Sequence, residues 1–325
     1  MKLLKYILKR VGMLIITMLV LITIIFFLFR ILPGNPVSMY IDSGLDRESQ
    51  ELLLRHYGLD KPYFQQYTIY LKNLLKGDLG NSFQYGKPAI EVIYERFWNT
   101  MILMLTSIII AFAIGIAIGA VLAWKRNTKF DLVGTIIALI ARCIPAFWTG
   151  MILLLVFSYK LNVLPGGGMH TPGLRFESIM QKYLNLDFLK HMILPTITSA
   201  FYSLATPLLV MRTSMLEIVK EDYIEMAYAK GLKEKYIINK HAVRTALLPV
   251  ITIFAVQAGA AIGGAVLIET VFRWPGMGRE IVLAVSYRDY PLAQAAFLLI
   301  GLMTALFNLI ADILYALLDP RVALS

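Results

Sequence analysis

Six long apolar stretches separate the polar segments of this chain. A helix needs about 20 apolar residues to cross a bilayer core, and the stretches that meet this length span residues 11–32, 99–124, 132–158, 192–211, 247–271 and 293–318. The fourth is the weakest because Pro195 and Pro207 interrupt it, although neighbouring helices can satisfy the backbone groups that a proline frees. The pattern predicts an all-α, polytopic membrane protein with six transmembrane helices.

The first stretch has features of both a signal peptide and a membrane anchor. Four basic residues precede it, as in a signal peptide. However, the apolar region of a signal peptide spans roughly 7–15 residues and ends at a small-residue cleavage site. This stretch is longer, has bulky side chains throughout and ends at Pro33-Gly-Asn-Pro36. We therefore interpret residues 1–32 as an uncleaved N-terminal transmembrane helix.

The polar segment 33–98 is too long to be a simple connector. Apolar residues recur at helical spacing within 46–59 and again within 63–77, and Gly58 and Gly77 stand where these helices would end. This pattern predicts a small folded cap on the outer face. The next outer segment, 159–191, contains Pro-Gly-Gly-Gly and is typical of turn-rich chain.

Composition agrees with a bilayer environment and gives no support for catalysis. Hydrophobic residues make up 58% of the 325 positions and charged residues only 16%, which is too apolar for a soluble domain of this size. Cys143 is the single cysteine, and the four histidines show no metal-ligand spacing. We expect no catalytic residue, no metal site, no cofactor and no nucleic-acid partner.

The distribution of charge predicts the orientation in the cell membrane. With the N-terminus inside, the inner segments carry 15 basic and 7 acidic residues, whereas the much longer outer segments carry 14 and 12. Basic residues concentrate in short cytoplasmic loops. Six spans then place both termini in the cytoplasm, with residues 319–325 as a cytoplasmic tail.

The inner loop 212–246 is dense in charge but has helix-forming sequence throughout. An amphipathic stretch from Asp222 to Lys230 ends at Gly231, which can adopt the left-handed conformation of a helix cap. A second helix is expected from Lys233 into the fifth span. Two short helices joined by a glycine suit insertion into a partner's groove, while the alternative is an ordinary solvated loop with a glycine cap.

Several segments carry a resemblance to a known family. They read DYIEMAYAKGL, HAVRTALLPVIT, GGAVLIETVFRWPGMG, RDYPLAQ and NLIADILYALLDPR, together with LPGNP, YGLDKPYFQQY, LLKGDLGNSF and RFWNTMIL in the first part of the chain. The chain resembles, over nearly its whole length, the B-type permease of the dipeptide/oligopeptide/nickel family of ABC importers. The resemblance implies a type I importer permease fold, similar to the methionine permease, with a core at 99–318.

The resemblance also implies partners and a coupling site. The partners would be a C-type permease homologue, two ATP-binding subunits, an extracellular solute-binding protein and a peptide substrate. The residues that would contact an ATP-binding subunit are Glu225, Met226, Ala227, Lys230, Gly231 and Leu232. The sequence departs from the family pattern at three positions, with Met226 in place of Ala, Tyr228 in place of Arg and Trp98 in place of Pro. Tyr228 could alter which ATP-binding subunit is preferred, and Trp98 affects only the local turn before the second span.

Other functions remain as alternatives. The sequence has no GxxxxGK[ST] motif to bind ATP phosphates. We therefore expect that this chain is not an enzyme and that ATP hydrolysis occurs in partner subunits.

The same architecture could import nickel or oligosaccharides. An ATP-independent secondary transporter would show inverted repeats and paired ionisable residues in the membrane, and neither is visible.

A few polar residues and glycines within the spans are candidates for special roles. Arg142 lies in the third span, where a basic residue costs about 2.5–3.5 kcal/mol to insert. It either lines the translocation path and meets a substrate carboxylate, or forms a structural pair. Gln257 and Glu269 are the other predicted path residues. Asp312, like Glu269, is expected to be a structural or gating residue and not a proton carrier.

Glycines in two spans predict close helix packing. Gly115 and Gly119 form a GxxxG motif in the second span, and Gly259, Gly263 and Gly264 lie in the fifth, where the contact could be with the partner permease. The stretch Trp-Pro-Gly-Met-Gly at 274–278 predicts an outer gate loop or a re-entrant turn.

Overall fold

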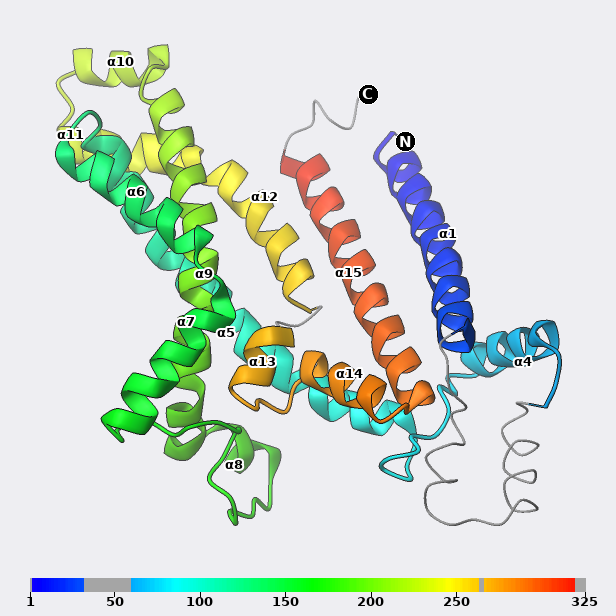
Figure 1. The fold of residues 1–325 in the computed structure, drawn as a ribbon. Helices are drawn as coiled ribbons and strands as arrows, with labels where there is room; N and C mark the ends of the chain where they lie inside the picture. The colour runs from blue at the N-terminus through cyan, green and yellow to red at the C-terminus, as the bar shows by residue number, and fades with distance from the viewer. Residues whose placement is uncertain (1, 32–59, 263–265, 319–325) are drawn as a thin grey trace.

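The computed structural model describes residues 2–31, 60–262 and 266–318, and this part of the chain is almost entirely helical and contains no strand. The helical segments, labelled as in Figure 1, are α1 (Lys2–Ile31), α4 (Tyr63–Leu75), α5 (Ala89–Trp124), α6 (Lys129–Cys143), α7 (Ala146–Leu153), η1 (Leu154–Lys160), α8 (Ile179–Tyr183), α9 (Leu186–Ile218), α10 (Asp222–Ala229), α11 (Glu234–Tyr236), η2 (Ile237–Ala242), α12 (Val243–Ile262), α13 (Val266–Val271), α14 (Met277–Ser286) and α15 (Tyr290–Leu318). The prediction of an all-α fold is confirmed.

Five helices of the described chain are long and apolar enough to cross a membrane, and they correspond to five of the six predicted spans. The third predicted span, 132–158, is not one continuous helix. It is divided between α6 and the run of α7 and η1, which meet at an angle of 94°. Pro145 causes the break, because a proline disfavours the helical conformation of the preceding residue, and Ile144 is extended with φ −75° and ψ 128°. Counted as one bent span, this pair completes the predicted six.

The helix α9 packs against α5, α6, α7 and α12, although its sequence made it the weakest predicted span. Pro195 and Pro207 lie inside the helix without ending it, and α9 packs along α5 over much of its length. A Cβ atom on Gly115 would lie 2.8 Å from the Pro207 ring, and one on Gly119 would collide with the backbone oxygen of Leu208. These glycines therefore allow the two helices to approach closely, as predicted from the GxxxG motif.

The long helix of the fifth predicted span, α12, ends at Ile262, nine residues earlier than expected. The short helix α13 follows residues 263–265 and points in a different direction (Figure 1). Gly263 and Gly264 lie outside the described residues. Gly259 packs within the chain itself, since a Cβ there would lie 2.6 Å from Cβ of Phe307 on α15.

The segment 33–98, which the charge distribution predicts to lie outside, is only partly described. Its first predicted helix, within 46–59, lies outside the described residues, as does the predicted tail 319–325. The second predicted helix is confirmed as α4, followed by Gly77 with φ +79°. The last ten residues, 89–98, are already the first turns of α5. The prediction missed them because Glu91, Glu95 and Arg96 make these turns too polar for an apolar window.

The beginning of α1 and the end of α15 lie at the same end of the molecule, which is also the end that carries α10 (Figure 1). The two helices pack side by side. Arg10 of α1 and Asp312 of α15 form an ion pair with 2.8 Å between Nη1 and Oδ2. Asp312 therefore has a structural partner on the first helix. The sequence did not predict this pair because its two residues lie about 300 positions apart.

Candidate functional site

A cavity of about 690 Å³ lies among α5, the α6–α7 bend, α9, α12 and α13. This volume falls in the range of roughly 300–1,000 Å³ that is common for small-molecule sites. Its apolar lining consists of Met104, Ile108, Pro145, Ala146, Phe147, Ala260, Ala261, Val266, Leu267 and Ile268, and its polar lining of Arg142, Ser199, Tyr202, Ser203, Thr206 and Gln257. Two of the three predicted path residues, Arg142 and Gln257, thus line one cavity.

Arg142 reaches this cavity because α6 ends beside it. The residue lies in the last turn of α6, and the chain then bends at Pro145. Within the described residues, Arg142 has no ion pair and no hydrogen bond. The expected structural pair with an acid is therefore not found in this part of the chain. Its guanidinium is the only charged group among the described residues that line the cavity.

Hydroxyl side chains on α9 form a second polar part of the lining, and the sequence analysis missed them. Ser199, Tyr202, Ser203 and Thr206 recur at i, i+3, i+4 and i+7, which places them on one face of a helix. That spacing was the signal that could have revealed them within the predicted span. The Ser199 hydroxyl is buried and has no hydrogen-bond partner in the described part of the chain.

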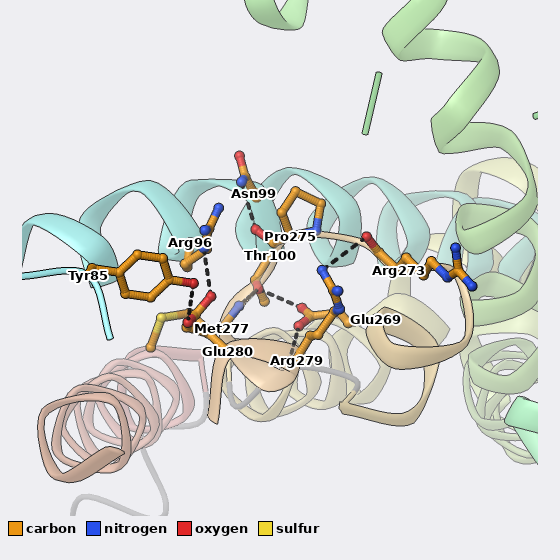
Figure 2. A network of polar contacts seen from close by, with 10 residues as sticks. All are labelled: Tyr85, Arg96, Asn99, Thr100, Glu269, Arg273, Pro275, Met277, Arg279 and Glu280. Atoms are coloured by element: carbon orange, nitrogen blue, oxygen red, sulfur yellow. Dashed lines mark hydrogen bonds and ion pairs between the residues drawn. The ribbon is translucent and has the colours of Figure 1, made fainter. Parts of the chain in front are cut away.

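The wall of the cavity formed by α13 depends on a buried carboxylate. Residues 266–268 line the cavity, whereas Glu269 is not among the lining residues and is completely buried. Thr100 of α5 donates its hydroxyl to Oε1 of Glu269 at 2.6 Å, and the backbone N–H of Arg279 donates to Oε2 at 2.9 Å (Figure 2). Glu269 thus joins α13, α5 and α14, and it does not face the cavity in this conformation.

The stretch 274–278 packs against the same part of α5. The Trp274 side chain is fully buried and donates from Nε1 to the backbone oxygen of Asn99 at 3.0 Å. The Asn99 amide in turn donates to the backbone oxygen of Pro275 at 2.7 Å (Figure 2). A Cβ atom on Gly276 would collide with the Glu269 carboxylate. This stretch therefore turns tightly between α13 and α14, and a larger residue at Gly276 would have to displace the Glu269 carboxylate.

A further ion pair continues this network along α14. Glu280 is nearly buried and accepts hydrogen bonds from Nε of Arg96 and from the hydroxyl of Tyr85, each at 2.9 Å (Figure 2). Burial, followed by the negative charge of Glu280, raises the pKa of Tyr85 above its usual value. The tyrosine therefore stays protonated and donates to the carboxylate. Together these contacts fix α13 and α14 on the first half of α5.

At the opposite end, α10 and the glycine after it have the predicted geometry. The helix spans Asp222–Ala229, and Gly231 follows with φ +73°, which favours glycine. Of the six residues predicted to contact an ATP-binding subunit, Ala227 is buried, and Glu225, Met226, Lys230, Gly231 and Leu232 are exposed. Met226 is a large apolar side chain that is 56% exposed on the solvent-accessible side of α10.

The buried side of α10 packs against two of the membrane-crossing helices. Ile224 and Ala227 are buried in an apolar cluster with Met211 and Met215 of α9 and with Ala246 of α12. Both α9 and α12 contribute residues to the cavity lining. The helices that pack against α10 therefore also form two of the cavity's walls.

Two family models match the chain. The model of the family described as binding-protein-dependent transport system inner membrane component matches residues 115–324. A second model, for the N-terminal part of such membrane components, matches residues 3–106. The chain belongs to this family. The permease is therefore a multi-pass inner-membrane component of a binding-protein-dependent transport system.

Curated relatives of the permease match it over nearly their full length. It is 36% identical to the dipeptide transport system permease protein of Alkalihalophilus pseudofirmus, with 98% of this chain and 99% of that protein covered. It is 37% identical to the oligopeptide transport system permease protein of Bacillus subtilis, with 98% of each covered. The dipeptide transport system permease protein of Escherichia coli K12 is also 37% identical, again with 98% of each covered.

A solved structure has a similar fold. A chain of the methionine ABC transporter MetNI, in inward-facing conformations, superimposes with a TM-score of 0.54. The match covers 71% of the permease and 97% of that chain, at 16% identity. At this identity the similarity shows the fold alone. It confirms the predicted type I importer permease fold.

Proposed function

We propose that this permease is one transmembrane subunit of an ATP-driven importer of di- or oligopeptides. The observation that carries this proposal is similarity over 98% of the chain to permeases named for dipeptide and oligopeptide transport. The sequence contains no GxxxxGK[ST] motif, so the ATP would be bound by other polypeptides.

The complete importer would contain a C-type permease homologue, two ATP-binding subunits and an extracellular solute-binding protein. The permease contributes one side of the pore, which includes the cavity lined by Arg142 and Gln257. The partner permease contributes the other side. The outer segment around α4 belongs to the surface that receives the binding protein.

In this proposal α10 is the coupling helix. Its exposed surface offers Met226 and charged side chains to an ATP-binding subunit, and its buried surface is attached to α9 and α12. Movement of the ATP-binding subunits is thereby transmitted to the cavity. The beginning of α1 and the end of α15 lie at the same end of the molecule as α10, which supports a cytoplasmic location for both termini.

Transport then follows from alternation between two states. A substrate or nucleotide shifts such an equilibrium only if it binds the two states with different affinity. The contacts of Glu269 with Thr100 and Arg279 hold α13 as a wall of the cavity in the present conformation. The outward-open state requires this wall to move relative to α9 and α12.

Co-purification from the native host tests the coupling helix. Tagged wild type is compared with Gly231→Asp and Glu225→Lys, and Glu177→Lys on the outer loop serves as the matched charge-reversal control. We expect an ATP-binding protein to accompany the wild type and the control, and to be lost from both α10 variants while each protein remains in the membrane. Absence of any ATP-binding protein from the wild type in mild detergent would favour an ATP-independent transporter.

Uptake measurements on cells that lack the importer test the substrate class. Complementation with the wild-type system should restore accumulation of labelled di- or tripeptide, and Gly231→Asp should not. Labelled nickel and a labelled oligosaccharide are measured in parallel. Restored uptake of either, without peptide uptake, would replace the peptide assignment.

A further inference from the structure

We propose that the cavity contains a subsite that binds the free carboxylate of a peptide, formed by Arg142 and the hydroxyl face of α9. The hydroxyl face consists of Ser199, Tyr202, Ser203 and Thr206. The inference rests on the proposed function, because it names how a peptide is recognised on its way through the membrane. Its basis is an unpaired cation and a row of unpaired hydroxyls that line the same cavity.

Arg142 has the chemistry of a carboxylate receptor. An arginine in a membrane-crossing region is costly unless it pairs or faces water, and Arg142 has neither an acidic partner nor a hydrogen bond within the described residues. Its planar group of N–H donors matches the two oxygens of a carboxylate. No acidic side chain in the cavity lining competes for it.

The hydroxyl face of α9 differs from the other hydroxyls on this helix. Thr198 and Thr213 donate to the backbone oxygens four residues earlier, Leu194 and Leu209, each at 2.8 Å. Such bonds satisfy a hydroxyl within its own helix. No such bond is formed by the cavity-facing hydroxyls among the described residues, and the Ser199 oxygen is buried without any partner.

An unpaired buried hydroxyl is unfavourable until water or a ligand reaches it. The hydroxyl face can donate to carboxylate oxygens and to main-chain carbonyls, and can accept from main-chain N–H groups. The remaining lining is largely apolar and carries no other charge. The subsite therefore recognises features that all peptides share, and it leaves the peptide side chains against apolar walls.

The test uses the whole importer, reconstituted in liposomes with its partner permease, ATP-binding subunits and binding protein. ATP-driven uptake is measured for trialanine, for trialanine C-terminal amide and for the C-terminal amide of Ala-Asp-Ala. Wild type is compared with Arg142→Gln and Arg142→Lys, and Arg175→Gln on the exposed outer loop is the matched control for loss of one positive charge. Because every reaction contains the same binding protein, its own selectivity cancels when each variant is divided by wild type.

We expect Arg142→Gln to reduce trialanine uptake roughly tenfold, the effect of losing a charge-assisted hydrogen bond, and to change uptake of trialanine amide less than twofold. Arg142→Lys should recover part of the loss, and Arg175→Gln should match wild type. Loss for Ala-Asp-Ala amide as well would show that a side-chain carboxylate also binds. An equal reduction for all three peptides, or none for any, would overturn the subsite.

A second pair of variants tests the hydroxyl face separately. Thr206→Val removes a cavity-facing hydroxyl, and Thr213→Val removes one that is bonded within α9. We expect Thr206→Val to raise the KM for trialanine, and Thr213→Val to leave unchanged both this KM and the ATPase activity that the binding protein stimulates. Equal KM values would overturn the role of the hydroxyl face. Absence of wild-type uptake for every peptide would overturn the proposed function itself, and the subsite with it.

Discussion

Arg212 of α9 forms a two-point ion pair with Asp131 of α6. Nε lies 2.6 Å from Oδ1, and Nη2 lies 2.8 Å from Oδ2. The side chains are 24% and 7% exposed, so the pair is largely shielded from solvent. It joins the first turn of α6 to the part of α9 that precedes α10. The opposite end of α6 carries Arg142, which lines the cavity.

Removing one partner of this pair should destabilise the protein. Asp131→Asn leaves Arg212 without its counter-charge, and we expect a loss of about 2 kcal/mol, the usual scale for hydrogen bonds to charged groups. Thermal unfolding of the purified protein in one detergent measures the change. In a double-mutant cycle with Arg212→Gln, the second substitution should cost much less once Asp131 is replaced. Additive effects would show that the two side chains do not interact in the membrane protein.

The contact between Gly276 and the Glu269 carboxylate predicts a conditional effect of adding one methyl group. Gly276 has φ −105°, which alanine adopts without strain, so Gly276→Ala should destabilise only by its collision with Glu269. We expect a cost of about 1–3 kcal/mol, as in overpacked cores. Gly12→Ala, with open space around its Cβ, is the matched control.

The same substitution in a Glu269→Ala background decides whether the collision is the cause. With the carboxylate absent, Gly276→Ala should have little further effect on the melting temperature. A full effect in both backgrounds would mean that Gly276 is required for another reason.

The left-handed conformation of Gly231 predicts a graded series after α10. Asparagine tolerates a positive φ, whereas a β-branched residue strongly disfavours it. We expect Gly231→Asn to retain most of the ATPase activity that the binding protein stimulates in the assembled importer, and Gly231→Val to lose most of it. Western blotting of membranes controls for the amount of each protein. Equal activities of the two variants would indicate that the backbone conformation at Gly231 is unimportant for coupling.

His170, in the loop between η1 and α8, predicts a dependence of that loop on pH. Its ring packs against Phe176 and Phe188, and burial lowers the pKa of His170 below its usual value of 6.5, while the Asp187 carboxylate, 3.4 Å from Nδ1, partly opposes this shift. Electrostatic interaction with the neighbouring His191 and Lys182 lowers it further. The packed loop thus prefers neutral His170.

The sign of the effect follows from linkage. Stability from this packing is fully present above pH 6.5 and is lost as the pH falls from there through the lowered pKa. Hydrogen exchange of residues 163–185, corrected for intrinsic rates, should show weaker protection at about pH 5.5 than at about pH 7.5. His170→Phe, which cannot be protonated, should abolish the difference. Stronger protection at the lower pH would contradict this account.

Local sequence patterns were sufficient for the elements whose residues interact with near neighbours. The apolar stretches located the long helices, and helical spacing located α4. Gly231 was found because a helix end needs a residue that tolerates positive φ. These features depend on chain geometry within a few residues, so the sequence alone determined them.

Other features depended on contacts between distant parts of the chain. The pairs Arg10–Asp312 and Arg212–Asp131 join helices far apart in sequence. Glu269 lies in a buried network and not in the cavity lining because its carboxylate accepts a hydrogen bond from Thr100 of α5. Nothing in the local sequence around any of these residues identifies its partner.

The sequence by itself determined that this chain is an all-α membrane protein with a helix–glycine element between its fourth and fifth spans. Only the tertiary structure decided that the third span bends sharply and which side of each helix faces the cavity. The physical reason is that lipid and protein interior are similarly apolar, so apolar composition locates a membrane helix without orienting it. Packing against neighbouring helices sets that orientation, and it brings Arg142 and the hydroxyl face of α9 to the same cavity.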